Sequence, residues 1–170
     1  MTTKYPTQQN QKQYTDLHLN ELTKLTGLEL MQAYVARKLP APPIAKLISM
    51  DITHVEHGHI FIAVQPNHQH LNTIGTVHGG FTATILDSAT GSAIHSTLNA
   101  GEIYSTIQLN IQYVRPISPD IGELIAEGVV VHRGKQLATA EAYLRDESNK
   151  LYAHATASCM ISPLNPKHDK

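Results

Sequence analysis

Asn72-Thr-Ile-Gly-Thr-Val-His78-Gly79-Gly80-Phe-Thr-Ala-Thr-Ile-Leu-Asp87 is the stretch of this 170-residue sequence that decides its fold. It leads from a polar loop into a segment with the periodicity of an amphipathic helix. One apolar stripe of this segment contains Phe81, Ile85, Ala89 and Ala93, with Leu86 on its edge. Gly91, Ser92 and Ala93 add small residues that permit the close approach of a sheet. The pattern predicts a central, largely buried helix from Gly79 to about Leu98.

Segments on both sides of this helix have the alternation or the turn residues of strands. They are residues 44–51 and 59–64 before the helix, and residues 103–113, 124–132, 136–145 and 151–162 after it. In residues 103–113 the expected inward set is Ile103, Ser105, Ile107, Leu109, Ile111 and Tyr113. Two strands, a helix and four strands predict an α+β fold, in which an antiparallel sheet carries the helix across one face.

The N-terminal third is expected to contribute a tail and a helical extension. Residues 1–15 lack apolar periodicity and are expected to be disordered. Leucines and other apolar residues then recur at helical spacing, with Gly27 as a break and Leu39-Pro-Ala-Pro-Pro43 as the end. These boundaries predict a single domain over residues 16–163 and a C-terminal tail over 164–170.

The composition excludes several classes of protein. The 13 Lys and Arg against 14 Asp and Glu provide no broad basic field for nucleic acid or an anionic membrane. The single Cys159 rules out an intrachain disulfide and fits a reducing compartment, so we expect a cytoplasmic location. No apolar run reaches the roughly 18 residues that a spanning helix needs.

The start of the predicted helix combines several groups that can hold an oxyanion. The first backbone N–H groups of a helix lack partners inside the helix, and the helix dipole adds positive charge there. Gly79 N–H is the expected donor, and Gly80 allows close approach of a ligand because it has no side chain. His78 and Asn72 are expected to supply side-chain support.

Asp87 lies further along the same helix, on the edge of the apolar stripe, where a carboxylate can face a cleft. It could attack a carbonyl directly or activate a water molecule, and spacing does not separate these routes. A capping or solvated role would be the ordinary one for an aspartate on a helix. The sequence has no Gly-x-Ser-x-Gly motif, and Cys159 has no evident histidine partner, which disfavours a serine or thiol nucleophile.

Three further motifs extend the picture, since residues 72–87 are followed by Ser105-Thr-Ile-Gln-Leu-Asn-Ile-Gln-Tyr-Val-Arg-Pro116, by Val131-His-Arg-Gly-Lys135 and by Tyr152-Ala-His-Ala-Thr-Ala-Ser-Cys159. Together they resemble the hotdog-fold acyl-CoA thioesterases of the phenylacetate-degradation (PaaI-like) branch, in the 4-hydroxybenzoyl-CoA thioesterase superfamily. The resemblance runs from about Gly27 to Ser162. It implies a long central helix wrapped by a curved antiparallel sheet, with active sites between two subunits of a homodimer or of a homotetramer of two dimers.

The resemblance also implies roles for individual residues. Asp87 would be the nucleophile or general base, Gly79 would bind the thioester oxygen, and Asn72 would polarise the carbonyl or position water, with His78 supporting the loop. Thr106 best matches a hydroxyl residue that holds the water in some relatives. Ser105 is one position away, and a one-residue shift would exchange their faces. Thr73 departs from the family pattern, in which proline often follows the asparagine.

The coenzyme A part of the substrate is expected to contact basic residues near its phosphates. The candidates are Arg115, Arg133 and Lys135, together with Gly80 and Gly134 as close backbone contacts. Residues 133–135 also fit an ordinary exposed hairpin turn. No cofactor beyond the coenzyme A of the substrate is implied.

Three functions remain open at this stage, and a metal site is disfavoured. The leading interpretation is hydrolysis of an acyl- or aryl-acyl-CoA to the free acid and coenzyme A. The alternatives are a hotdog hydratase or dehydratase and a catalytically inactive acyl-CoA-binding module. The pairs His57/His59 and His68/His70 lack a supporting carboxylate or cysteine set, so we expect no metal site.

Overall fold

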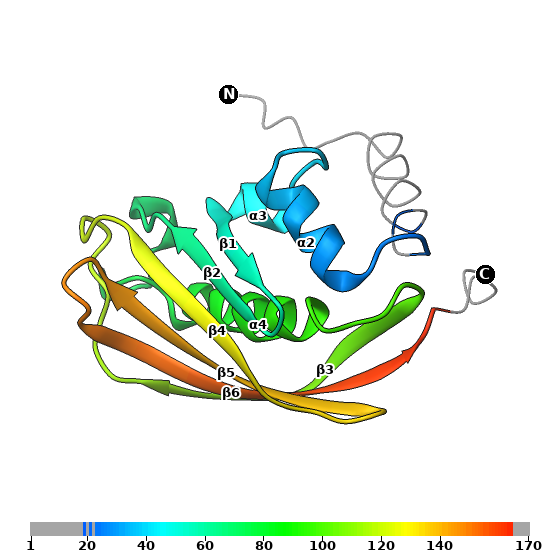
Figure 1. The fold of residues 1–170 in the computed structure, drawn as a ribbon. Coiled ribbons are helices and arrows are strands. Elements are labelled where there is room, and N and C mark those ends of the chain that lie inside the picture. The colour runs from blue at the N-terminus through cyan, green and yellow to red at the C-terminus, as the bar shows by residue number, and fades with distance from the viewer. Residues whose placement is uncertain (1–18, 20, 22, 165–170) are drawn as a thin grey trace.

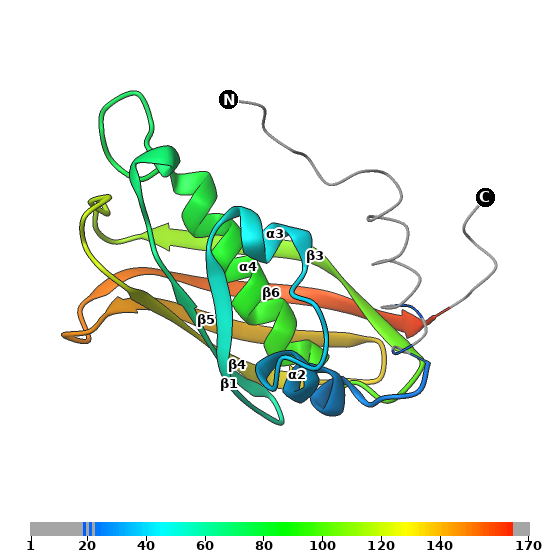
Figure 2. The same ribbon diagram turned by 90° about the horizontal axis from the view of Figure 1, so that it is seen from above.

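The computed structural model describes residues 19, 21 and 23–164 of the chain. A curved sheet of six strands wraps around one long helix, α4 (Gly79–His95), and a helical segment covers the other side of α4 (Figures 1 and 2). The expectations for residues 1–15 and 165–170 lie outside the described residues, as do Leu17 and Leu22 of the expected N-terminal helix.

The sheet has the order β1-β2-β4-β5-β6-β3, and each pair of neighbouring strands in it is antiparallel. Its strands are β1 (Met50–Glu56), β2 (His59–Val64), β3 (Glu102–Tyr113), β4 (Leu124–Arg133), β5 (Leu137–Asp146) and β6 (Leu151–Pro163). The expected α+β arrangement of an antiparallel sheet with a helix across one face is confirmed. β1, the first strand of the chain, and β3, the strand that follows α4, form the two edges.

The central helix begins at the predicted glycine and ends at His95, three residues before the predicted end. Its apolar stripe packs into the main core: Ile85, Ala89 and Ala93 have no exposed surface, and Phe81 is 7% exposed. The helix α2 (Gly27–Val35) begins at Gly27, the residue that was predicted to break the N-terminal helical region. A capping box between Thr26 and Glu29 initiates this helix.

The prediction of a strand over residues 44–51 is wrong in its first half. Residues Pro43–Leu47 form the short helix α3, and the strand begins only at Met50. Pro43 is the first helical residue, where its fixed φ favours a helix and its missing N–H costs no hydrogen bond. The proline run was interpreted only as the end of one helix, but it also begins another.

The predicted alternation of β3 is also wrong in its first half. A bulge between Thr106 and Gln108 shifts the pairing with β6, so Ile107 is 59% exposed. Before the bulge, Thr106 turns inward towards Cys159 and Ser105 is exposed. An extra residue in one strand reverses the faces of all the residues on one side of it, and a simple period of two cannot detect that change.

Close contact between α4 and the sheet depends on two glycines. Gly128 of β4 faces α4, and Gly91 of α4 faces β3. A Cβ atom at Gly128 of β4 would lie 2.3 Å from the Ala89 carbonyl oxygen of α4. A Cβ atom at Gly91 of α4 would lie 2.6 Å from the Tyr104 hydroxyl of β3. The small residue predicted at Gly91 therefore makes room for a side chain from the edge strand.

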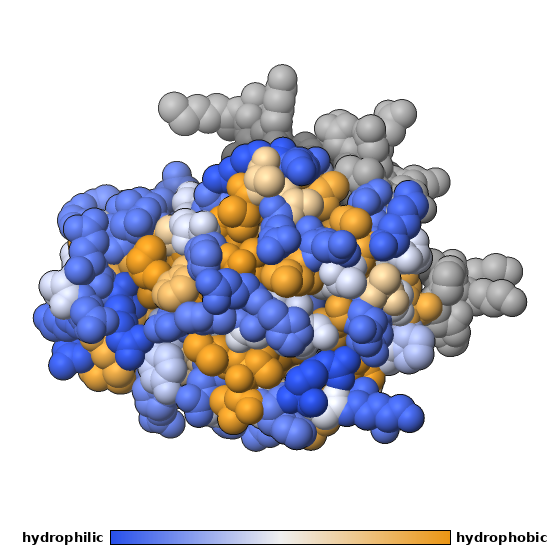
Figure 3. Space-filling model, in the orientation of Figure 1, coloured by the Kyte–Doolittle hydropathy of each residue, from blue (hydrophilic) through white to orange (hydrophobic). Residues whose placement is uncertain are grey.

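None of the described helices is long and apolar enough to cross a membrane. On the face drawn in Figure 3, apolar residues emerge in separate patches between hydrophilic ones.

Candidate active site

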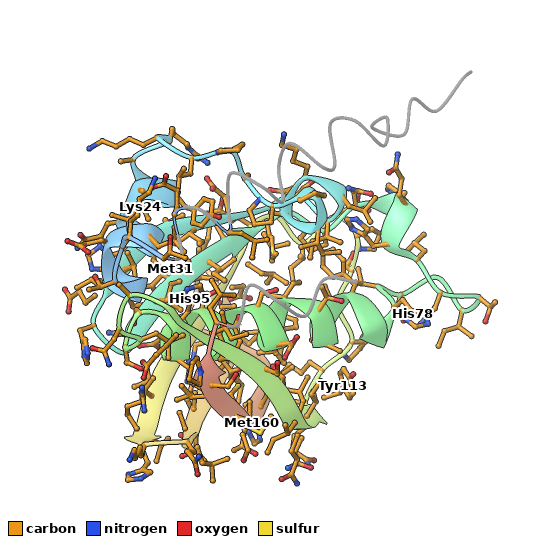
Figure 4. All side chains as sticks on the ribbon, turned by 90° about the vertical axis from the view of Figure 1, so that its right-hand side faces the viewer. Lys24, Met31, His78, His95, Tyr113 and Met160 are labelled. Atoms are coloured by element: carbon orange, nitrogen blue, oxygen red, sulfur yellow. The ribbon has the colours of Figure 1, made fainter. Side chains whose placement is uncertain are left out.

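The predicted site residues fall into two groups at different levels of α4. His78, Gly79, Gly80 and Asn72 lie at the start of the helix, and Asp87 lies two turns further on. Figure 4 shows His78 and Tyr113 near one end of α4 and His95 near the other. The two groups have different surroundings, because the first is built by neighbouring residues of one loop and the second by β3, β6 and the α2–α3 segment.

His78 caps the helix. Its Nδ1 atom accepts a hydrogen bond of 2.8 Å from the Gly80 N–H. The neutral imidazole therefore carries its proton on Nε2. This bond gives His78 the place of a helix cap, and it leaves Gly80 without a free N–H to offer a ligand. Gly79 is the first helical residue, and among the described residues its N–H has no hydrogen-bond acceptor.

The side chain of Asn72 closes the loop that precedes the helix. Its Oδ1 atom accepts hydrogen bonds from the Ile74 and Thr76 N–H groups, at 3.0 and 3.2 Å, and its Nδ2 donates to the Thr76 hydroxyl at 2.9 Å. The amide oxygen is therefore engaged by the loop, and one hydrogen of Nδ2 remains for a ligand. Asn72 was expected to act on the carbonyl or on water, and its contacts in the structure are with its own loop.

A cavity of about 250 Å³ opens beside the start of the helix. Gly79, Tyr113 and Arg115 line it, together with Tyr152 and Ile117. The Tyr113 hydroxyl donates a hydrogen bond of 3.1 Å to the Gly79 carbonyl oxygen, and the Arg115 guanidinium donates to the Leu151 carbonyl oxygen. The predicted oxyanion donor and one predicted phosphate ligand thus share a cavity that has a polar, cationic wall.

Asp87 lies on the wall of a second cavity, of about 240 Å³, between α4 and the segment formed by α3 and β1. Its Oδ1 atom is shielded from solvent and has no hydrogen-bond partner among the described residues. A buried carboxylate oxygen without a donor is costly for the folded state. Such an atom calls for an explanation, and a bound substrate or water is a chemically suitable one.

Tyr104 and Cys159 lie near this carboxylate on the side of the sheet, and Thr106 contacts Cys159. The Tyr104 ring packs over Gly91 and lines the same cavity. Burial and the nearby Asp87 charge raise the pKa of Tyr104 far above its ordinary range. Burial likewise raises the pKa of the Cys159 thiol, and a 3.7 Å contact links its Sγ to the Thr106 hydroxyl. Both groups therefore stay protonated at neutral pH.

The three basic candidates for phosphate binding do not come together within one chain. Arg133 forms a 2.9 Å ion pair with Glu102 at the start of β3, and Arg115 follows the end of the same strand. The twelve residues from Glu102 to Tyr113 make eleven steps, which span about 37 Å in an extended strand. Arg133, Gly134 and Lys135 therefore lie at the opposite end of the sheet from Arg115, and Arg133 is already paired.

Among the described residues, no group of three or more His, Cys, Asp or Glu side chains could hold a metal ion. His68 pairs with Asp120 at 3.1 Å, and His59 pairs with Glu127 at 2.9 Å. The partly buried His70 stacks on the core residue Phe81, with ring centroids 4.1 Å apart.

Sequence reasoning missed the two tyrosines of β3. Tyr104 was assigned to the outer face because the β3 bulge cannot be detected from the alternation of residues. The small residue Gly91 did indicate that another element packs closely there. Tyr113 was assigned to the inner face, and it is 56% exposed beside Gly79. The ion pair between Arg37 and Asp51, at the rim of the Asp87 cavity, had no signal in the sequence.

Comparison with known sequences places these features in a family. The model of the thioesterase superfamily matches residues 74–153, which contain the loop, α4 and β3 to the start of β6. Human acyl-coenzyme A thioesterase 13 is 30% identical over 112 residues, covering 65% of this chain and 73% of the human protein. The mouse protein of the same name is 36% identical over 81 residues, or 47% of this chain and 56% of the relative. The chain spans about half the length of the first three curated relatives that it matches, 44 to 58%.

Comparison with solved structures supports the same conclusion. A phenylacetic acid degradation-related protein of Ralstonia eutropha superposes with a TM-score of 0.70 at 28% identity, over 76% of this chain and 98% of that one. The PaaI protein of the Escherichia coli phenylacetic acid degradation operon shares the fold, with a TM-score of 0.69 at 22% identity over 78% of this chain and 94% of that one. The helix, the wrapped sheet and the sequence match agree, and the chain belongs to the thioesterase superfamily with its hotdog fold.

Proposed function

We propose that this protein hydrolyses the thioester bond of an acyl- or aryl-acyl-coenzyme A, giving the free acid and coenzyme A, at sites formed between two copies of the chain. The observation that carries the proposal is the pair of unsatisfied groups on α4, the Gly79 N–H and the buried Asp87 Oδ1. One is a hydrogen-bond donor for a developing oxyanion, and the other is a base or nucleophile. The family membership and the similarity to acyl-coenzyme A thioesterase 13 support this choice of reaction.

The need for a second copy follows from the geometry of one helix. Gly79 and Asp87 are eight residues apart, which is about 12 Å along a helix axis. The free N–H groups of the first turn point away from the helix, so an acceptor bound there lies further still from Asp87. One thioester carbon cannot be within reach of both groups of the same chain. The two groups can act together if they come from different chains.

The edge strand β3 offers a surface for this association. It is twelve residues long and has no charged residue between Ile103 and Tyr113. A long, uncharged edge exposes unpaired backbone groups and tends to pair with another strand. Antiparallel pairing of two β3 edges brings the Tyr113 end of one chain, with its Gly79, towards the Tyr104 end of the other, with its Asp87. The proposal is therefore at least a homodimer.

In the proposed reaction the Gly79 N–H of one chain binds the thioester oxygen and polarises the carbonyl. Asp87 of the other chain either removes a proton from water as the water attacks the carbonyl carbon, or attacks that carbon itself. Negative charge collects on the oxygen beside Gly79, and the carbon–sulfur bond breaks as the carbonyl re-forms. In the first route, coenzyme A leaves as a thiol with the proton that Asp87 took from water, and the acid leaves as a carboxylate. In the second route, coenzyme A leaves first, and a water molecule then hydrolyses the acyl–Asp87 anhydride, which releases the acid and restores the Asp87 carboxylate. Thr106 contacts Cys159, which lies near Asp87, and its hydroxyl is suited to hold the attacking water.

The first test is the release of free thiol from a panel of aliphatic and aromatic acyl-CoAs. Gly79→Pro deletes the donor N–H, and proline is well tolerated at the first position of a helix, after a residue as extended as His78 (φ −63°, ψ 136°). Gly79→Ala adds a Cβ and keeps the N–H, so it is the matched control. We expect Gly79→Pro to lose about 10²–10³-fold in kcat, and Gly79→Ala to lose far less. No turnover by the wild type on the whole panel would contradict hydrolysis and favour a binding module.

The second test examines the shared site. Gly79→Pro chains and Asp87→Asn chains are inactive separately under the proposal, but a mixed dimer contains one site with an intact Gly79 and an intact Asp87. Unfolding and refolding the two variants together should therefore restore thiol release well above that of either alone. If the mixture stays as inactive as its components although mixed dimers form, the sites are not shared.

A further inference from the structure

Two polar atoms of the Asp87 cavity have no hydrogen-bond partner among the described residues. One is Asp87 Oδ1, which is shielded from solvent. The other is the hydroxyl oxygen of Tyr104, a side chain of β3 that lines the same cavity. Much of the remaining lining is apolar, so polar atoms find few partners in it. The carboxylate oxygen accepts hydrogen bonds and the phenol donates one, so the two groups are complementary.

The Tyr104 hydroxyl and the Asp87 carboxylate lie on the same face of α4. A Cβ atom at Gly91 would be 2.6 Å from the Tyr104 hydroxyl. Gly91 is four residues after Asp87, and Cβ atoms four residues apart on a helix are about 5–6 Å from each other. One water molecule that is hydrogen-bonded at both ends spans about the same distance. The spacing therefore suits a bridge of one water between the two groups.

We propose that Tyr104 is a positioning residue of the hydrolytic site, and that its hydroxyl holds the Asp87 carboxylate in its reactive orientation through one bridging water molecule. This water accepts a hydrogen bond from Tyr104 and donates one to Asp87 Oδ1, which leaves Oδ2 free to act. It is distinct from the attacking water, for which Thr106 is the candidate. The inference rests on the proposed thioester hydrolysis, and it adds a residue that acts through Asp87.

Other polar side chains of this cavity are less well placed for the same role. The Arg37 guanidinium donates two hydrogen bonds to the Asp51 carboxylate. The Ser88 hydroxyl donates a hydrogen bond of 2.7 Å to a backbone carbonyl one turn earlier in α4. Ser92 is five residues after Asp87, which turns it about 140° away around the helix. The tyrosine of the edge strand is the better donor for the carboxylate.

The protonation and the packing of Tyr104 also suit this role. Burial and the nearby Asp87 charge raise the pKa of Tyr104 far above its ordinary range, so its hydroxyl keeps the proton that it donates. The ring makes an edge-on contact with the His95 ring, with centroids 5.5 Å apart. On its other side, the missing side chain of Gly91 makes room for it. These contacts hold the hydroxyl at one place beside α4.

The first measurement uses Tyr104→Phe, which removes the hydroxyl and keeps the ring. Tyr143→Phe is the matched control, because it removes the same atom from the outer face of β5, where the hydroxyl donates to Glu141. Thiol release is measured with the acyl-CoA that the wild type hydrolyses best. We expect Tyr104→Phe to lower kcat about tenfold, the effect of one lost hydrogen bond to a charged group, with little change in KM. Tyr143→Phe should keep the kcat and KM of the wild type.

The second measurement tests whether the hydroxyl acts through Asp87. Asp87→Asn removes the carboxylate that Tyr104 is proposed to position. Adding Tyr104→Phe to that variant should therefore cause little further loss of the residual activity, because residues that act as a unit have non-additive effects.

The failures of the two proposals can be told apart. Absence of thiol release by the wild type from every acyl-CoA tested overturns the proposed function itself. Hydrolysis by the wild type with an undiminished kcat in Tyr104→Phe overturns the inference and leaves the hydrolysis in place. A raised KM at unchanged kcat also overturns it, because the hydroxyl would then bind the substrate. An equal loss from Tyr104→Phe with and without Asp87→Asn overturns it as well, since the two residues would act independently.

Discussion

The polar side chains at the start of α4 have hydrogen-bond partners close in sequence, whereas the carboxylate in its middle has an oxygen without a partner among the described residues. At the start, His78 and Asn72 bond to backbone groups no more than four residues away and hold their own loop. In the middle, Asp87 is surrounded by residues from β3, β6 and the α2–α3 segment, and one of its oxygens has no partner among the described residues. One helix can therefore contain a locally stabilised start and a buried, unsatisfied carboxylate oxygen, because local bonds stabilise the first and packing by distant elements confines the second.

The largest expected effect separates function from stability at Asp87. Asp87→Asn should lower thiol release by at least about a hundredfold, the scale of a positioned base or nucleophile. It should not lower the melting temperature, since it removes a buried charge that lacks a donor. Steady-state kinetics and thermal unfolding of the same preparation measure both. Undiminished turnover would remove Asp87 from the site, and a clear loss of stability would mean that the carboxylate has a partner in the folded chain.

The next effect concerns packing in the middle of the helix. Gly128→Ala would place a methyl group 2.3 Å from the Ala89 carbonyl oxygen, so α4 and β4 must move apart. We expect a loss of about 2–4 kcal/mol in the free energy of unfolding. Gly79→Ala at the start of the helix is the control, because its methyl group meets the Tyr113 ring at an ordinary 3.4 Å. Equal denaturation midpoints for the two variants would break the contrast between the two regions.

A smaller effect tests the local frame at the start of the helix. His78→Ala removes the acceptor for the Gly80 N–H and should cost about 1 kcal/mol, as the loss of other helix caps does. His78→Asn supplies another good capping side chain and should recover most of that stability. Urea denaturation of the three proteins gives the ranking. A stable His78→Ala protein would show that the imidazole bond does not hold this end of α4.

The smallest expected effect concerns the cap of α2, where the Glu29 carboxylate takes part, in contrast to the His78 imidazole that caps α4. Hydrogen bonds from the Thr26 backbone N–H and hydroxyl lower the pKa of Glu29 below its ordinary 4.5. A carboxyl group with a lowered pKa in the folded state contributes stability above about pH 4.5, and this contribution is lost as the pH falls through the folded-state value. Glu29→Gln keeps the capping box without the charge, so its melting temperature should fall less than that of the wild type on acidification. Parallel melting curves against pH would contradict the contribution of Glu29.

The elements that sequence reasoning predicted well are those whose pattern is local. The stripe of α4 and the strand His59–Val64 match the predictions because burial on one face imposes a regular period. The helix α3 was missed because a proline can either end one helix or begin the next, and the sequence pattern does not distinguish the two cases. The faces of Tyr104 and Thr106 were reversed because a bulge at Ile107 interrupts the period.

By itself, the sequence determined the central helix, the glycine at which it begins and the position of the acid that follows on the same helix, because all of these depend on spacing along one chain. Only the tertiary structure decided that Asp87 faces an apolar cavity under α3, that Tyr104 packs over Gly91, and that Arg115 and Arg133 lie at opposite ends of the sheet. Those relations arise where strands distant in sequence become neighbours, and the register of their pairing is set by packing and bulges that no single segment encodes.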